Sequence, residues 1–123
     1  MIHGIGTDIA ETARFKKKLK NQKFLDLVFS PEEQQYCMSQ GHPEQHLAAR
    51  FAAKESYMKA LGTGWAQGAD FKEIEVAHNE EGAPIIQLHG ATQSYFDKSE
   101  LKDIFVSISH TAEYAVAYVT ITK

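Results

Sequence analysis

The run from Arg50 to Leu61, followed by a glycine-rich turn, constrains the fold more than any other part of the sequence. Apolar side chains recur here at helical spacing, and at about 100° per residue several of them fall in one narrow arc. These residues are Leu47, Phe51, Met58 and Leu61. The pattern predicts one long helix over residues 43–61, packed by this arc against the rest of the protein.

Two charged residues lie in or beside the apolar arc. Lys54 lies within it, and we expect its aliphatic stem to follow the apolar surface while its ammonium group reaches water. Glu55 is shorter and costly to bury unpaired, so its carboxylate needs a cation. That cation could be a basic side chain or a metal ion.

Length and composition indicate one folded domain over residues 1–123. With 43% hydrophobic and 24% charged residues, the chain is ordinary for a globular protein and long enough to bury a core. No apolar run approaches the roughly 20 residues of a membrane span, and residues 1–6 lack the pattern of a signal peptide. Cys37 is the sole cysteine, which excludes an internal disulfide. We therefore expect a cytoplasmic protein without a membrane partner.

Residues 2–9 predict a first strand, with Gly4 and Gly6 on the same face as Asp8. Two glycines on one face leave room for another backbone or a ligand to approach closely. Asp8 ends this predicted strand, where a side chain can do chemistry. An acidic residue at such a position can equally cap the helix that follows.

The remaining chain alternates between helical and strand patterns. Four helices are expected, over residues 11–20, 31–40, 43–61 and 91–99. Four further strands are expected in two hairpins, over residues 73–78, 84–88, 105–109 and 114–121. This order predicts an α+β fold with a mainly antiparallel sheet packed on a long central helix.

His42 and His46 are four residues apart, a spacing that lets two histidines on one helix face bind zinc. Pro43 stands where a metalloprotease motif requires Glu, and no third ligand is near in sequence. We therefore favour ordinary surface histidines over a zinc site.

Basic residues are concentrated at the start of the chain. Residues 1–23 carry six Lys or Arg and two Asp or Glu, a net charge of +4, whereas residues 24–123 carry seven and fourteen, a net charge of -7. The basic segment favours an anionic partner, although a solvated helix face gives the same pattern. Nucleic acid is disfavoured as that partner, because no aromatic residues are interleaved with the lysines and the rest of the chain is acidic.

Three motifs occur in order along the chain. They are Gly4-Ile5-Gly6-Thr7-Asp8-Ile9 with Glu11, then Arg50-Phe51-Ala52-Ala53-Lys54-Glu55 with Lys59-Ala60-Leu61-Gly62-Thr63-Gly64, and finally Ser107-Ile108-Ser109-His110-Thr111. Together they resemble the holo-acyl-carrier-protein synthase family, which are short 4'-phosphopantetheinyl transferases. The resemblance extends from residue 2 to about residue 119.

This resemblance implies the phosphopantetheinyl transferase fold and a transferase activity. Such enzymes move the phosphopantetheine arm of coenzyme A onto a serine of apo acyl carrier protein in fatty acid biosynthesis, and they release adenosine 3',5'-bisphosphate. It further implies a magnesium ion held by Asp8 and Glu55, in agreement with the preference of Mg²⁺ for one or two carboxylates plus phosphate oxygens. A non-catalytic module that binds coenzyme A or acyl carrier protein is the alternative.

The resemblance also implies roles for other residues. Lys59 could form an ordinary bridge to Glu55 one turn earlier, but the family match favours contact with the pyrophosphate or leaving group. Either Glu55 or a metal-polarised water could deprotonate the serine. The residues expected to hold or approach the nucleotide's phosphates are Arg50, Gly62, Thr63, Gly64, His110 and Thr111. Without the match, His110 would be read as a hydrogen-bonded turn residue.

An acidic acyl carrier protein would account for the basic segment, because family members dock it on a basic first helix. Arg14 matches that position best, and the other expected contacts are Lys17, Lys18, Lys20, Lys23 and the apolar Phe24. The chain has one copy of the fold, so it resembles the short members that form homotrimers with sites at the subunit interfaces.

Overall fold

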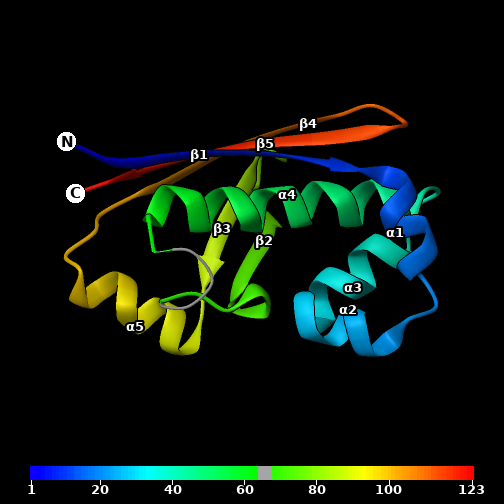
Figure 1. The fold of residues 1–123 in the computed structure, drawn as a ribbon, viewed down its shortest axis with the longest axis horizontal. Coiled ribbons are helices and arrows are strands. Elements are labelled where there is room, and N and C mark those ends of the chain that lie inside the picture. Colours follow the sequence, from blue (N-terminus) through cyan, green and yellow to red (C-terminus); the bar gives the residue numbers. More distant parts are fainter. Residues whose placement is uncertain (64–67) are drawn as a thin grey trace.

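The structure is a computed structural model that describes residues 1–63 and 68–123. Its elements in chain order are β1 (Ile2–Glu11), α1 (Thr12–Lys18), α2 (Gln22–Val28), α3 (Pro31–Met38), α4 (Pro43–Leu61), the short 3₁₀ helix η2 (Phe71–Glu73), β2 (Ile74–His78), β3 (Pro84–Leu88), α5 (Gly90–Lys98), β4 (Ile104–His110) and β5 (Tyr114–Thr122). Figure 1 shows the N- and C-termini side by side at one end of the molecule. The α+β class is as predicted.

All strand pairing is antiparallel and is divided between two sheets. The larger sheet has the order β1-β5-β4, and the smaller is the β2-β3 hairpin. Strand β1 pairs with β5 along nearly its whole length, from Ile2 opposite Thr122 to Glu11 opposite Tyr114. The first strand therefore lies at an edge of the larger sheet, paired with the last strand.

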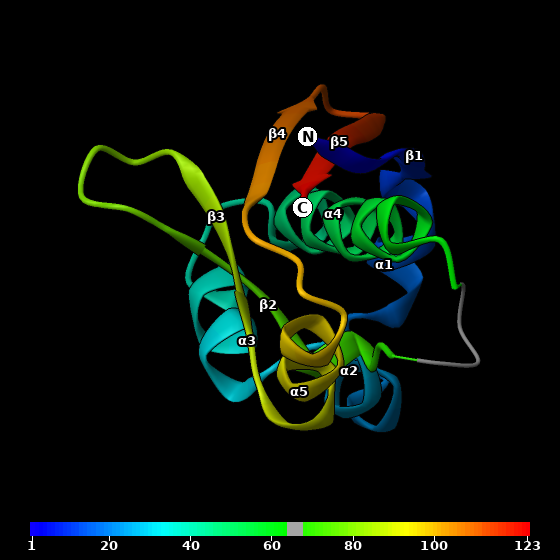
Figure 2. The same cartoon turned by 90° about the vertical axis from the view of Figure 1, so that its left-hand side faces the viewer.

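Helix α4 lies between two layers. Figure 2 shows the three-stranded sheet on one side of it, and α2, α3, α5 and the β2-β3 hairpin on the other. Because both sides are covered, residues of α4 outside the predicted apolar arc are buried as well. Ala52, Ser56 and Tyr57 are each fully buried. The helix forms the centre of the core.

Gly4 and Gly6 let β1 lie directly against α4. A Cβ atom at Gly6 would overlap the main-chain oxygen of Ser56, and one at Gly4 would overlap that of Ala60. The predicted close approach to these glycines is therefore made by the backbone of α4. The contact sets how near the side chains of β1 come to those of the helix.

Lys54 does not reach water, contrary to expectation, and is fully buried. Its ammonium group donates to the Glu33 carboxylate at 2.6 Å and to the main-chain oxygens of Val28 and Phe71 at 2.8 Å. The other Glu33 oxygen accepts from the Val76 amide at 3.0 Å. Burial lowers the pKa of Lys54, and the Glu33 carboxylate opposes that effect. The pair ties α4 to α2, α3, η2 and β2.

The basic segment forms two helices where one was expected. Helix α1 ends at Lys18, and the apolar residues after it form the separate helix α2, which Asn21 caps by accepting a hydrogen bond from the Phe24 amide at 3.1 Å. The predicted helix start at residue 31 is confirmed, and a capping box precedes it, in which Ser30 and Glu33 each accept a hydrogen bond from the other's amide. Among the helices in the described parts of the chain, none is both long and apolar enough to cross a membrane.

Candidate active site

Asp8 lies on the partly buried face of β1, the face that carries Gly4 and Gly6. The strand continues beyond it to Glu11, so Asp8 lies within the strand and not at its end as predicted. Helix α1 begins at Thr12 without a side-chain cap, so Asp8 is not a helix cap. Its carboxylate is left available for interactions with α4.

Glu55 projects from α4 beside Asp8 and is partly buried. Burial and the neighbouring Asp8 carboxylate raise the pKa of Glu55, while Lys59 and Arg14 partly oppose this. The two cationic side chains therefore compensate the two carboxylates incompletely. An additional cation between Asp8 and Glu55 would be electrostatically favourable.

Lys59 links α4 to β1. Its ammonium group donates to the Thr7 main-chain oxygen at 2.9 Å and to Asp8 Oδ1 at 3.2 Å. The ion pair seen is therefore with Asp8, and not the bridge to Glu55 within the helix that the sequence allowed. About half of the Lys59 side chain is exposed, so this contact is weak and its ammonium can move to a ligand.

Local sequence explains why these side chains meet. Glu55 and Lys59 are four residues apart and so share a face of α4. The glycines bring β1 against this helix, which places Asp8 next to both. Of the site residues predicted from the sequence, this site brings together Asp8, Arg14, Glu55 and Lys59.

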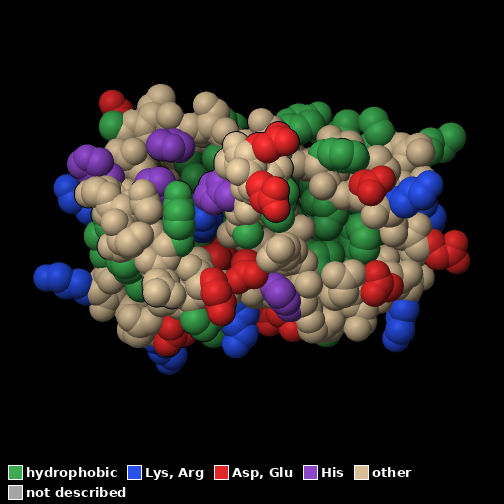
Figure 3. Space-filling model, turned by 180° about the vertical axis from the view of Figure 1, so that it is seen from behind, with side chains coloured by type: hydrophobic (Ala, Val, Ile, Leu, Met, Phe, Trp, Pro, Cys, Tyr) green, Lys and Arg blue, Asp and Glu red, His purple; other side chains and the backbone are tan. Residues whose placement is uncertain are grey.

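Arg50 and His110 belong to a second cluster. The Arg50 guanidinium carbon lies 4.5 Å from the centre of the Tyr36 ring. That ring also lies 5.7 Å from the His46 ring and 5.3 Å from the His78 ring, and His46 lies 5.9 Å from His110. Figure 3 shows histidines gathered towards one end of this face of the molecule. Sequence reasoning missed Tyr36 and His78 and treated His46 as an ordinary surface residue, because only the fold brings α3, α4, β2 and β4 together here.

Thr111 follows His110 in the turn between β4 and β5. Its hydroxyl accepts hydrogen bonds from the main-chain amides of Glu113 at 3.2 Å and Tyr114 at 3.1 Å. The side chain therefore shapes the turn and keeps His110 at the end of β4.

The glycine turn begins where α4 ends. Gly62 adopts a left-handed conformation with a φ of 90°, and its amide donates to the Met58 oxygen at 3.1 Å. A glycine suits this position because other residues rarely adopt that conformation. Thr63 follows and is partly buried, whereas the predicted site residue Gly64 lies outside the described residues.

The basic segment forms a surface next to the carboxylates. The exposed Arg14 guanidinium carbon lies 5.3 Å from the Phe51 ring centre, and Lys18 lies 4.9 Å above the ring of the partly buried Phe24. The other basic residues predicted to contact a partner are exposed, and they are Lys17, Lys20 and Lys23. Arg14 joins this surface to Glu55, whose pKa it lowers.

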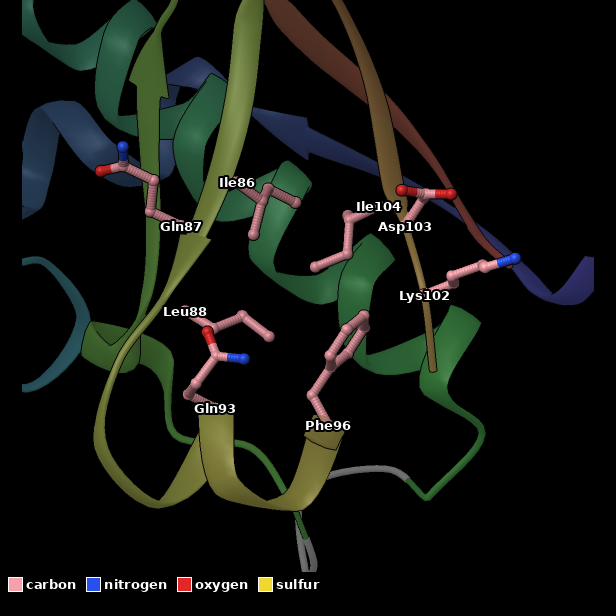
Figure 4. Close-up of a pocket in the computed structure, with 8 residues that line it drawn as sticks. All are labelled: Ile86, Gln87, Leu88, Gln93, Phe96, Lys102, Asp103 and Ile104. Atoms are coloured by element: carbon pink, nitrogen blue, oxygen red, sulfur yellow. The ribbon is translucent and has the colours of Figure 1, made fainter. Parts of the chain in front are cut away.

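Two pockets lie away from Asp8 and Glu55. One, of about 300 Å³, is lined by Arg50, Tyr36 and His78 and so belongs to the second cluster. The other, of about 440 Å³, lies between β3, α5 and β4, and Figure 4 shows Ile86 and Ile104 facing each other across it. No predicted site residue among those that the structure describes lines this second pocket, whose wall combines four apolar side chains with two glutamines, a lysine and an aspartate.

Comparison with known proteins shows the family of the chain. The family model of the 4'-phosphopantetheinyl transferase superfamily matches residues 4–119. The holo-[acyl-carrier-protein] synthase of Geobacter sp. (strain M21) is 44% identical over 125 residues, covering 100% of both chains. That of Thermoanaerobacter sp. (strain X514) is 44% identical over 92% of this chain and 82% of its own.

Solved structures give the same result. The crystal structure of holo-[acyl-carrier-protein] synthase from Neisseria meningitidis has a TM-score of 0.92 and 33% identity, with 100% of both chains covered. The Helicobacter pylori enzyme in complex with coenzyme A has a TM-score of 0.83 and 32% identity, covering 96% of this chain and 99% of its own. The chain therefore belongs to the 4'-phosphopantetheinyl transferase superfamily, within its holo-[acyl-carrier-protein] synthases.

Proposed function

We propose that this enzyme transfers the phosphopantetheine arm of coenzyme A to a serine hydroxyl of apo acyl carrier protein in fatty acid biosynthesis, with release of adenosine 3',5'-bisphosphate. The convergence of Asp8, Glu55 and Lys59 at the edge strand carries the proposal, because it offers two carboxylates and a cation to a pyrophosphate. The names of the relatives and the solved complex with coenzyme A support this pair of substrates.

The two carboxylates fit a magnesium ion. Their mutual repulsion contributes to the raised pKa of Glu55, and a divalent cation held by Asp8 and Glu55 would relieve it. No group of three or more histidine, cysteine or acidic side chains suited to a metal occurs within residues 1–63 and 68–123, so the other ligands would be phosphate oxygens and water, as Mg²⁺ prefers. When bound, Mg²⁺ offsets negative charge on the phosphate that is attacked.

The chain's own side chains would do the remaining work at this site. Lys59 would turn its ammonium group from Asp8 to the pyrophosphate or the leaving group, which its partial exposure permits. The pKa of Glu55 is raised towards neutral pH, and a general base with such a pKa is suited to accept the serine proton. A metal-polarised water is the other candidate base.

The second cluster is proposed to hold phosphates of the nucleotide. Arg50 supplies a buried guanidinium, and His110 an imidazole at the end of β4, followed by the Thr111 turn. The glycine turn, Gly62, Thr63 and Gly64, is proposed to lie near the same phosphates.

The basic surface is proposed to dock acyl carrier protein. The proposed contacts are Arg14, Lys17, Lys18, Lys20, Lys23 and Phe24. Arg14 can pair with carboxylates through two parallel hydrogen bonds, whereas the lysines supply charge without that geometry. We therefore expect docking to weaken as salt concentration rises.

We further propose that the enzyme is a homotrimer with its sites at the subunit interfaces. The outer face of the larger sheet supports an assembly, because it exposes apolar and aromatic side chains that a monomer would leave in water. Those at least 40% exposed include Ile2, Ile5, Ile9, Phe105, Tyr114, Val116 and Tyr118. Asp8 lies on the edge strand of this sheet and Glu55 beside it on α4, where a neighbouring chain could complete the site.

Intact-mass measurement tests the proposed function. Apo acyl carrier protein incubated with the enzyme, coenzyme A and Mg²⁺ should gain the mass of one phosphopantetheine group, and chelation of the metal should prevent the gain. Coenzyme A bound by the enzyme but never consumed would instead show a non-catalytic binding module.

A further inference from the structure

Arg50 is a buried cation that forms no ion pair within residues 1–63 and 68–123. Its side chain is only 4% exposed, and its Nε atom is shielded from water with no hydrogen-bond partner. The guanidinium group lies over the face of the Tyr36 ring, in a cation–π contact. A buried guanidinium with unmet hydrogen-bonding capacity is costly, so its presence points to an anionic ligand.

Three imidazoles from three elements surround the same place. His46 lies one turn before Arg50 on α4, His78 ends β2, and His110 ends β4. The Tyr36 ring contacts the rings of His46 and His78, and His46 contacts His110. Within the described parts of the chain, no side-chain hydrogen bond engages any of these imidazoles. Their nitrogens are therefore available to a ligand.

The acidic side chains near the cluster do not neutralise Arg50. Those that line its pocket or act on its histidines come from α3, α4 and β2, and they are Glu32, Glu33, Glu44 and Glu75. Glu33 is held by Lys54, and Glu75 accepts a hydrogen bond from Ser30 at 2.6 Å. The Glu32 side chain is exposed, and Glu44 faces His42 at 3.6 Å. The cluster therefore keeps its cationic character.

The histidines respond to this cationic environment. Burial lowers the pKa of His46, and Arg50, His110 and His78 lower it further, while Glu44 opposes them. Burial and Arg50 also lower the pKa of His78. A dianion bound among these side chains would attract their positive charges and so raise the pKa values of His46 and His78.

We propose that these side chains form a proton-linked phosphate subsite, in which His46 and His78 join Arg50 and His110 and take up protons when a phosphate monoester binds. The monoester is the 3'-phosphate of coenzyme A, so the proposal rests on the proposed function. Protonated imidazoles donate two hydrogen bonds each and carry positive charge, both of which favour a dianionic phosphate.

The direction of the pH dependence follows from this linkage. Without a ligand, His46 and His78 titrate below the ordinary value of 6.5, and a bound dianion raises their pKa values. The added affinity is therefore present at low pH and is lost as the pH rises through the raised values in the complex. Coenzyme A should bind about tenfold more tightly at pH 6 than at pH 8.

Calorimetric titration with coenzyme A at pH 7, in two buffers of different ionisation enthalpy, measures how many protons the enzyme takes up on binding. The wild-type enzyme should take up about one proton per coenzyme A bound. The double variant His46→Gln/His78→Gln should lose most of this uptake and most of the pH dependence. His42→Gln removes a histidine that is exposed at the start of the same helix and should keep the wild-type uptake. Circular dichroism at pH 8 checks that each variant is folded.

Two other ligands identify the group that is bound. Coenzyme A without its 3'-phosphate should bind with little proton uptake, whereas inorganic phosphate should bind weakly and show uptake that depends on His46 and His78. Equal uptake by the wild type and the double variant would overturn the subsite, and so would equal uptake with and without the 3'-phosphate. Failure of coenzyme A to bind at any pH would overturn the proposed function instead.

Discussion

At the scale of single residues, Glu55 is held where its negative charge is unfavourable. Burial and Asp8 raise its pKa, and the nearby Lys59 and Arg14 only partly oppose them. The ion pair of Lys59 is with Asp8 and not with Glu55. A site that leaves two carboxylates under-compensated is less stable without its cation and ready to bind one.

Replacing Glu55 should stabilise the protein while impairing its function. Because the folded-state pKa is raised, Glu55 contributes most to stability at low pH and loses that contribution as the pH rises through the raised value. Glu55→Gln should therefore raise the melting midpoint at pH 7.5 without metal by about 1–2 °C, since partial exposure screens the effect, and it should give less gain at pH 4.

The control for this prediction is Glu80→Gln, an exposed carboxyl in the connection between β2 and β3, which should leave the midpoint unchanged. Mg²⁺ should raise the midpoint of the wild type more than that of Glu55→Gln. A lower midpoint for Glu55→Gln at pH 7.5 would show that the carboxylate is well compensated.

Neighbouring residues show which features a sequence can reveal. Glu55 could be singled out because a short carboxylate beside an apolar arc needs a cation, and the structure places it beside Asp8 and Lys59. Lys54 was misjudged because its partner Glu33 lies 21 residues away, and its other acceptors are main-chain oxygens that periodicity does not reveal. Arg14 could be placed on a basic segment, but its effect on Glu55 depends on packing.

At the scale of elements, the site depends on the contact between β1 and α4. Gly4 and Gly6 allow the strand to lie on the helix backbone. On the adjoining strand β5, the Ala117 oxygen lies 3.1 Å from the Ser56 hydroxyl, which is 2.7 Å from the Ala52 oxygen of its own helix. Asp8, two residues beyond Gly6, is thereby fixed next to Lys59. Main-chain contacts fix the strand against the helix, and they thereby fix the relative positions of the site's side chains.

Gly6→Ala tests this contact. The added methyl group would overlap the Ser56 oxygen, which is main-chain and cannot move aside alone, so β1 must shift away from α4. We expect a loss of about 1–3 kcal/mol in the free energy of unfolding, measured by urea denaturation, together with reduced transferase activity. Gly41→Ala is the matched control, because a Cβ there meets nothing within 4 Å. Equal stability of the two variants would show that β1 is not held by close packing.

Most elements were predictable because each has a local signal. The strands β2 and β3 and the helix α4 lie within a residue of the expected bounds. The division of the basic segment into α1 and α2 was not predicted, since the Asn21 cap gives only a weak signal within a lysine-rich run. In the second cluster, the resemblance pointed to Arg50 and His110, whereas Tyr36, His46 and His78 were not predicted, because four separate elements must meet to bring them there.

At the scale of the whole molecule, the two faces of the larger sheet differ in what covers them. The inner face packs on α4, whereas the outer face exposes apolar and aromatic side chains such as Ile9, Phe105 and Tyr118. A face of this composition next to Asp8 fits the proposed trimer, in which a neighbouring chain would both cover the sheet and border the site.

Tyr118→Asp tests the assembly. This residue lies near the middle of the outer face, opposite Thr7 on one side and Ser107 on the other. Light scattering should give the mass of three chains for the wild type and a smaller mass for the variant, because a buried unpaired carboxylate disfavours association. Leu27→Asp changes an exposed apolar residue on α2 and should keep the wild-type mass. A monomeric wild-type enzyme would contradict the trimer.

The role of the two carboxylates is tested most directly with the enzyme variants Asp8→Asn and Glu55→Gln. Each is incubated with apo acyl carrier protein, whose intact mass is followed over time. With coenzyme A and Mg²⁺ present, the wild type and Glu80→Gln should add one phosphopantetheine group. Each carboxylate variant should be slower by at least about 100-fold, while remaining folded. Addition of the group at the wild-type rate by both carboxylate variants would contradict a metal-dependent transfer at Asp8 and Glu55.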